Sequence, residues 1–206
     1  MIGLLKKWWA IKDDAVAKAC LILAHGYGLT KDDKLPENAK RVLAKTLELA
    51  RKFPAAKILF YNANCYWRPE QFEAQLKKDY LTALGAEADD PIWDKIIDNG
   101  VNSTINEVLI ALNTDNLAGK TVISICERIH MRRIRLIWQR ETRRYHPKVD
   151  FKIIGFEGIW TDDMPSFFCK SASRWLALNI IFSGAYAIFG NLMKNLSHKF
   201  FLKHDE

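Results

Sequence analysis

Cysteine and glycine are scarce in this sequence, and their scarcity excludes two common kinds of site. The four cysteines form no Cys-x-x-Cys pair and lack the spacing of zinc ligands, so no metal site is expected. Cys20 and Cys126 lie inside apolar runs, and we expect reduced thiols in a cytoplasmic environment. The dinucleotide-binding pattern Gly-x-Gly-x-x-Gly is absent as well, because Gly26-Tyr27-Gly28 is followed by Asp32-Asp33.

Targeting signals and long uncharged runs are also scarce. Met1–Ile11 carries Lys6 and Lys7 inside a short apolar run, which does not fit a cleavable signal peptide. Only Trp175–Met193 is both uncharged and long enough to span a bilayer. Its polar and small residues favour a buried pair of C-terminal helices that breaks near Ser183-Gly184, with peripheral membrane contact as the alternative.

Charge is plentiful and unevenly distributed. The chain has 31 basic and 24 acidic residues, a formal net charge of +7. One basic stretch favours anionic partners such as phosphates or acidic lipid, and its other interpretation is a solvated helix face. No known nucleic-acid-binding motif accompanies it, so nucleic acid is not the expected partner. The stretch contains Arg128, Arg132, Arg133, Arg135, Arg140, Arg143, Arg144 and Lys148.

Apolar runs of strand length alternate with helical patterns along the chain. The expected helices cover 37–52, 69–84, 104–112 and 129–144, and the expected strands cover 18–24, 56–61, 94–97, 121–126 and 151–156. This order predicts one α/β domain over residues 1–206, with a mainly parallel sheet covered by helices on both faces. The core is expected at about 18–156 and a C-terminal helical extension at 157–206.

The carboxyl ends of parallel strands meet at one edge of a sheet, where open α/β sheets bind ligands. Four expected strand ends are polar or contain glycine: His25–Gly28, Asn62–Asn64, Asp98–Thr104 and Glu127–Arg133. Glycine lets the backbone approach a ligand closely. We therefore expect a site at this edge, and its residues after the first two strands are His25, Gly26, Gly28 and Asn62.

Charged residues after Cys126 point to acid–base and anion-binding chemistry. Glu127, His130 and Arg133 are spaced by three and can share a helix face. His130 beside Glu127 could act as a general acid or base. Arg132 and Arg133 could hold a phosphate or a carboxylate.

Other candidate residues lie at the starts of the expected helices. Thr104-x-x-Glu107 is typical of a capping box, and free backbone N–H groups at such a helix start can also bind an anion. Arg41 either reaches the site or pairs with Asp32-Asp33, and Asn38 faces either solvent or the ligand. Glu73, in the first turn of its helix, suits the helix dipole.

The order of these motifs resembles the YdcF-like family. The matching segments are the glycine-containing turn after the first strand, Glu37-Asn38-Ala39-Lys40-Arg41, Glu73, Asn102-Ser103-Thr104-x-Asn106-Glu107 and Ile129-His130-Met131-Arg132-Arg133. The resemblance covers about Cys20 to Phe156. It implies a Rossmann-like three-layer fold and adds Asn38, Glu73, Asn102 and Asn106 to the expected ligand-binding residues.

Members of that family have a poorly defined activity and are linked to bacterial envelope biogenesis. The resemblance, together with the basic strand end, favours an anionic small molecule as the ligand. This is either a nucleotide-like molecule such as S-adenosylmethionine or a phosphate-bearing envelope precursor. The residues leave open whether the protein is an enzyme, and the alternative function is a non-enzymatic accessory protein at a membrane surface. Many members carry N-terminal membrane helices, and without one this chain is expected to be soluble or peripheral in the cytoplasm.

Overall fold

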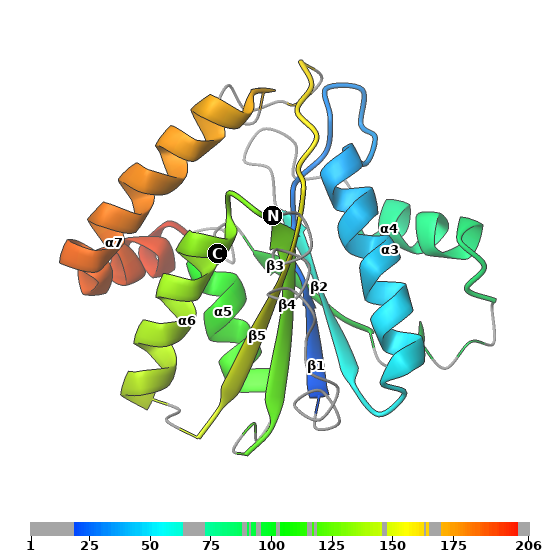
Figure 1. Cartoon of the computed structure of the whole chain (residues 1–206), viewed down its shortest axis with the longest axis horizontal. Helices are drawn as coiled ribbons and strands as arrows, with labels where there is room; N and C mark the ends of the chain where they lie inside the picture. The colour runs from blue at the N-terminus through cyan, green and yellow to red at the C-terminus, as the bar shows by residue number, and fades with distance from the viewer. Residues whose placement is uncertain are drawn as a thin grey trace, which may run out of the picture.

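A single five-stranded sheet forms the centre of the protein. The computed structural model describes residues 19–63, 73–87, 90, 92–93, 96–101, 104–114, 117, 119–145, 148–162, 164 and 170–201. The strands follow the order β3-β2-β1-β4-β5, and every neighbouring pair is parallel (Figure 1). Their bounds are β1 Ala19–Ala24, β2 Lys57–Ala63, β3 Ile96–Val101, β4 Thr121–Glu127 and β5 Asp150–Phe156.

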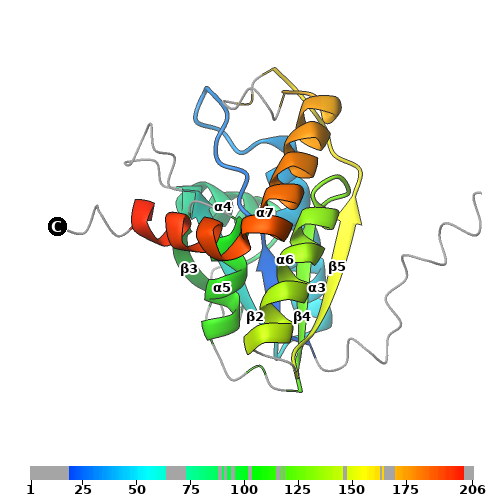
Figure 2. The ribbon, with the colours of Figure 1, turned by 90° about the vertical axis from the view of Figure 1, so that its left-hand side faces the viewer.

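Helices cover both faces of this sheet. Those on one face are α3 (Glu37–Lys52) and α4 (Glu73–Ala83), and those on the other are α5 (Thr104–Thr114) and α6 (Met131–Tyr145) (Figures 1 and 2). The last helix, α7 (Ala172–Phe201), packs against α6 and α5. The predicted Rossmann-like three-layer α/β fold is therefore confirmed.

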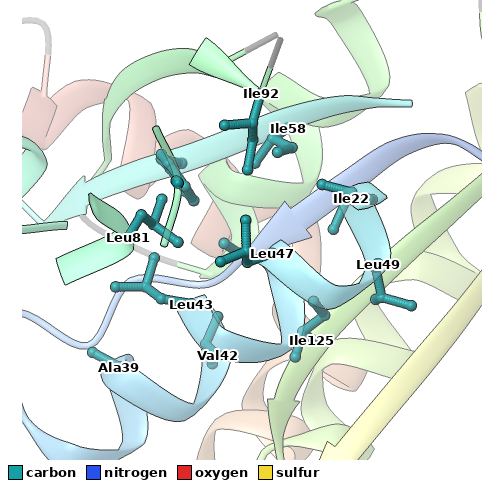
Figure 3. Packing of buried hydrophobic residues seen from close by; sticks show 14 of the residues in the cluster. Ile22, Ala39, Val42, Leu43, Leu47, Leu49, Ile58, Leu81, Ile92 and Ile125 are labelled. Atoms are coloured by element: carbon teal, nitrogen blue, oxygen red, sulfur yellow. The ribbon is translucent and has the colours of Figure 1, made fainter. Parts of the chain in front are cut away.

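Two hydrophobic clusters join these layers. Ile22 of β1 and Ile125 of β4 point towards α3, where they pack with Val42 and Leu47 (Figure 3). The neighbouring strand residues, such as Leu23, point to the opposite face and pack with residues of α5 and α6. Strands buried on both faces need continuous apolar runs, which is why β1 and β4 were recognisable from the sequence.

The edge of the sheet was harder to predict. β3 runs to Val101 and includes Asp98, Asn99 and Gly100, which the sequence placed after a shorter strand. β2 likewise continues to Ala63, so that Asn62 lies within a strand and pairs with Gly100, not in a loop. Strand pairing uses backbone groups, so a polar stretch can join an edge strand without giving an apolar signal.

The C-terminal extension differs from the prediction. α7 consists of two helical segments joined at a kink at Phe189 (φ −113°, ψ 23°), so the predicted pair of helices is present but breaks later than the predicted Ser183-Gly184. A single glycine in a helix costs only about 1 kcal/mol, so Gly184 does not end it. The helix is also not buried, because large apolar side chains such as Ile181 and Ile188 are exposed. Among the described residues, Ala172–Met193 is the one segment long and apolar enough to cross a membrane.

Candidate functional site

The carboxyl ends of β1 and β4 lie side by side at the centre of the sheet. The strands that follow them lie on opposite sides, β2 next to β1 and β5 next to β4. This is the topological switch point, where open α/β sheets bind ligands. Because His25 follows β1 and Glu127 ends β4, two of the predicted site residues meet there.

His25 links three elements through its two ring nitrogens. Nδ1 lies 2.6 Å from Oε2 of Glu107 in α5, and Nε2 lies 2.6 Å from Oγ of Ser124 in β4. The other carboxylate oxygen of Glu107 accepts the backbone N–H of Gly26 at 2.9 Å. These contacts are tertiary, whereas the sequence predicted a local capping role for Glu107. The N–H of Gly26 is already used, so it is not a donor for an anion.

The series Glu107–His25–Ser124 has the connectivity of a hydrolytic triad, but its position does not allow that role. Ser124 is 0% exposed. It sits in the middle of β4, paired with Leu23 on one side and Ile153 on the other. A nucleophile must reach the substrate, so we assign this series to holding β1, β4 and α5 together.

Glu127 is a fully buried carboxylate held by two hydrogen-bond donors. Tyr27 donates its hydroxyl to Oε2, and Trp175 of α7 donates its indole N–H to Oε1. Burial raises the pKa of Glu127, and these two hydrogen bonds oppose part of the rise. Burial and the neighbouring Glu127 also raise the pKa of Tyr27, which keeps its hydroxyl protonated.

His130 lies in the turn before α6, not one turn into the helix as predicted. Its backbone carbonyl accepts a hydrogen bond from the N–H of Ile134. Its Nε2 lies 3.2 Å from Oγ1 of Thr104, the first residue of α5. The same hydroxyl accepts a hydrogen bond from Nη2 of Arg133 at 2.6 Å. Thr104 therefore joins the two residues that the sequence selected for proton transfer and anion binding.

The other ring nitrogen of His130 faces Glu127. Its Nδ1 is buried, lies 3.8 Å from Oε1 of Glu127, and has no hydrogen-bond partner in the described part of the chain. Burial lowers the pKa of His130 well below its ordinary value, and Arg133 and His25 lower it further. The imidazole is thus neutral at neutral pH. Since the Thr104 hydroxyl accepts from Arg133, its own proton can point to Nε2, which places the ring proton on Nδ1.

The segment after β5 and the start of α7 cover this cluster. Asn38 exchanges two hydrogen bonds with the backbone of Ile159, at 3.0 and 2.8 Å, and Arg41 donates to the carbonyl of Glu157 at 2.6 Å. Asn38 is buried, so the expectation that it faces solvent is wrong. Trp175 packs edge-on against His130, with 5.4 Å between ring centroids.

The remaining predicted site residues are less closely involved. Glu73 begins α4 and pairs with Lys77 at 2.8 Å, both side chains being buried. Gly28 has a positive φ of 68°, which suits glycine in the turn after β1. Asn106 lies in the first turn of α5, and Arg132 is exposed on α6. Asn102 and the N-terminal Trp8-Trp9 lie outside the described residues.

Three members of the cluster were missed as site residues from the sequence: Tyr27, Ser124 and Trp175. A serine inside the apolar run of β4 was a usable signal, because a buried hydroxyl needs a partner. Trp175 gave no such signal, since it is 48 residues from Glu127. Within the described ranges, no group of three or more His, Cys, Asp or Glu side chains is placed to hold a metal ion.

Comparison of the chain with protein-family models, with curated proteins and with solved structures gives no match. The fold and the cluster at the switch point are therefore the basis for a functional proposal.

Proposed function

We propose that this protein binds an anionic small molecule at the switch point between β1 and β4, as the resemblance to the YdcF-like family implies. The ligand is nucleotide-like, such as S-adenosylmethionine, or a phosphate-bearing precursor of the bacterial envelope. Arg133 and Arg132 neutralise its charge. If the protein is an enzyme, His130 and Glu127 transfer the proton.

The bridge through Thr104 is the observation that carries this proposal. Its hydroxyl contacts both Arg133 Nη2 and His130 Nε2, at 2.6 and 3.2 Å. It also stands where α5 begins, close to the start of α6, and helix N-termini attract negative charge. An anionic group that replaces the Thr104 hydroxyl as the partner of Arg133 would lie directly beside the imidazole.

The two titratable groups are suited to proton transfer. A neutral imidazole can accept a proton at Nε2, and the buried Glu127 carboxylate near Nδ1 would stabilise the imidazolium that results. Burial raises the pKa of Glu127 and lowers the pKa of His130, and perturbed pKa values of this kind cluster at functional sites.

Access to the cluster requires movement of its cover. His130 is 3% exposed and Glu127 is 0% exposed, so a ligand cannot reach them while Trp175 is in place. In this proposal the first turn of α7 shifts when the ligand enters, and the indole of Trp175 leaves Glu127.

Cys126 is a free, buried thiol, which is compatible with a cytoplasmic location.

A thermal-shift screen tests the proposal. The purified protein is heated with adenosyl cofactors, nucleotides, sugar nucleotides, polyprenyl phosphates and inorganic phosphate. A ligand at 100 times its Kd stabilises the fold by about 2.7 kcal/mol, which raises Tm by roughly 5–10 °C in a protein of this size. The shift should disappear in the variant Arg132→Gln/Arg133→Gln.

The matched control is Arg135→Gln/Arg143→Gln, which removes the same charge from exposed positions of the same helix. A shift lost in both double variants would mean that net charge alone attracts the ligand. A shift retained in Arg132→Gln/Arg133→Gln would remove the α6 start from the site. If none of these compounds raises Tm, the anion-binding proposal fails.

A further inference from the structure

The outer face of α7 is the largest apolar surface among the described residues. Nearly all exposed large hydrophobic side chains lie on this helix, and Leu84 after α4 is the exception. Three of them are 54%, 64% and 73% exposed: Ile180, Ile181 and Ile188. The other members on α7 are Leu176, Phe182, Phe189 and Leu192, of which Phe182 also lies against Arg133 of α6. A gathering of exposed large apolar side chains on one element marks an interaction site.

The inner face of the same helix is fixed to the domain by polar contacts. Tyr186 is buried and donates its hydroxyl to Glu141 of α6 at 2.6 Å. Arg140 of α6 donates to the carbonyl of Tyr186 at 2.7 Å, and Arg144 donates to Oδ1 of Asn191 at 2.6 Å. Trp175 anchors the N-terminal end on Glu127. These contacts hold α7 against α6, beside which it lies in Figure 2.

The burial of α7 separates it from an ordinary core helix. Core helices of soluble proteins can have the same length and composition, but they are mostly covered by protein. Only 17% of the apolar window within Ala172–Met193 is buried. A helix that crossed the bilayer would have to give up the Tyr186–Glu141 and Arg140 contacts. With these contacts kept, the segment of α7 before the kink at Phe189 can meet a bilayer only along its length, as a helix that lies in the interface.

The charges on α6 and α7 indicate the kind of partner. α7 contains no acidic residue, and it packs against α6, the most basic of the described helices. Arg132, Arg135 and Arg143 are exposed on that helix, α6, and Arg174 is exposed at the start of α7. A second copy of this chain would bring the same cationic surface to the contact, and like charges repel. An anionic lipid surface complements both the apolar face and the arginines.

We propose that α7 docks the protein on the surface of an anionic membrane, with its outer apolar face in the interface and the α6 arginines on the headgroups. The observations behind this docking surface are separate from those behind the proposed ligand site. Docking gives the protein a peripheral membrane location that uses the C-terminal helix.

Vesicle flotation tests the docking surface. The full chain is mixed with vesicles of phosphatidylcholine alone, or of phosphatidylcholine with phosphatidylglycerol, at low and high NaCl. We expect flotation with the anionic vesicles that weakens as salt rises, because salt screens the headgroup attraction. Ile180→Ser/Ile181→Ser/Ile188→Ser should reduce the partition coefficient about tenfold or more, since three large apolar side chains leave the interface.

Two further variants separate the contribution of the α7 apolar side chains from that of the α6 arginines. Leu84→Ser changes the exposed leucine outside α7 and should float like the unchanged protein. Arg135→Gln/Arg143→Gln should lower binding to the anionic vesicles by about tenfold, and in the thermal-shift screen it should keep its ligand response. Failure of ligand binding and failure of membrane docking are therefore separate results. Circular dichroism and thermal melting of each variant show that the fold is kept.

Several outcomes overturn the proposal. One is the absence of flotation with either vesicle, and another is flotation that the triple serine variant does not reduce. Vesicle binding that is the same for both lipid compositions and at both salt concentrations would show that the arginines do not contact the headgroups. The protein could also fail to bind vesicles and form a dimer in light scattering. If the triple serine variant is then a monomer, the apolar face binds a second copy of the chain. Retention in the vesicle pellet after alkaline carbonate would show a spanning helix and overturn the in-plane arrangement.

Discussion

The ring nitrogen Nδ1 of His25 lies 2.6 Å from Oε2 of Glu107, and this contact joins the end of β1 to the first turn of α5 across 82 residues of sequence. Both side chains are buried, at 2% and 4% exposure. A buried polar pair is stable only when its remaining hydrogen-bonding groups are also satisfied. Gly26 and Ser124 satisfy them, so this pair fixes how the strand ends meet.

The variant Glu107→Ala should lower the free energy of unfolding by about 3 kcal/mol. It removes the partner of the buried Nδ1 of His25 and of the half-buried N–H of Gly26. Glu107→Gln keeps one acceptor and should cost about half as much. Urea unfolding at neutral pH measures the free energy of unfolding of both variants. The control is Glu48→Ala at an exposed position, whose free energy of unfolding should lie within about 0.5 kcal/mol of that of the unchanged protein. Equal stability of Glu107→Ala and Glu48→Ala would contradict the assigned role of the pair.

Ser124 should not react with a fluorophosphonate probe, although its hydroxyl is hydrogen-bonded to His25, which is hydrogen-bonded in turn to Glu107. The probe cannot reach a side chain that is 0% exposed in the middle of a central strand. The measurement is mass spectrometry of the folded protein after incubation with the probe. Ser124→Ala should instead reduce stability by about 1–3 kcal/mol, because Nε2 of His25 loses its partner. Labelling at Ser124 would show that the series is catalytic after all.

The pH dependence of stability should contain a contribution from His130. Its pKa in the folded protein lies well below the ordinary value of 6.5. The unfolded chain therefore binds a proton that the folded protein does not, and folding is penalised as pH falls below about 6.5. The stability of the unchanged protein relative to His130→Gln should fall by up to about 1.4 kcal/mol per pH unit below that point.

Urea unfolding of both proteins between about pH 5 and pH 8 checks this expectation. Glu127 has the opposite sign: its folded pKa is raised, so its contribution is present below the unfolded value of 4.5 and is lost as pH rises. Glu127 is present in both proteins and largely cancels in their difference. A difference that does not vary with pH would mean that His130 titrates alike in the folded and unfolded states.

Two glycines of α7 should respond in opposite ways to alanine. A Cβ at Gly184 would meet no atom within 4 Å, so Gly184→Ala should stabilise the protein by roughly 0.5–1 kcal/mol through helix propensity. A Cβ at Gly190 would approach Nη1 of Arg140 to 2.5 Å and displace the guanidinium from the carbonyl of Tyr186. Gly190→Ala should therefore be at least about 1 kcal/mol less stable than Gly184→Ala. Thermal melting of the two variants decides this, and equal melting temperatures would show that α7 is not held against α6 as described.

The sequence was sufficient for the parts of the fold that depend on local pattern. Continuous apolar runs predicted the central strands β1 and β4, and the spacing of Val42, Leu43 and Leu47 predicted α3. The position of His25 and Glu127 at strand ends followed from the parallel order of the strands. The edge strand β3 was placed less well because its pairing is carried by backbone groups.

Contacts between distant elements could not be read from the sequence. Glu107 looked like a capping residue because its local spacing fits that role, yet its side chain contacts His25 and Gly26 at the end of β1. Trp175 was seen only as part of an apolar run, and nothing near it in the sequence points to Glu127. The same apolar composition suits a helix covered by protein or by lipid, so the exposure of Ile181 and Ile188 had to come from the structure.

One helix carries both proposed surfaces, and this connects them thermodynamically. Trp175 and Phe182 of α7 both lie against Arg133, with the guanidinium 5.6 and 5.4 Å from the two ring centroids. If a ligand enters by displacing the first turn of α7, a membrane that changes the position of that turn changes the affinity for the ligand. Linkage then requires that the ligand change the affinity for the membrane by the same factor. Binding at either surface would therefore change the binding affinity of the other.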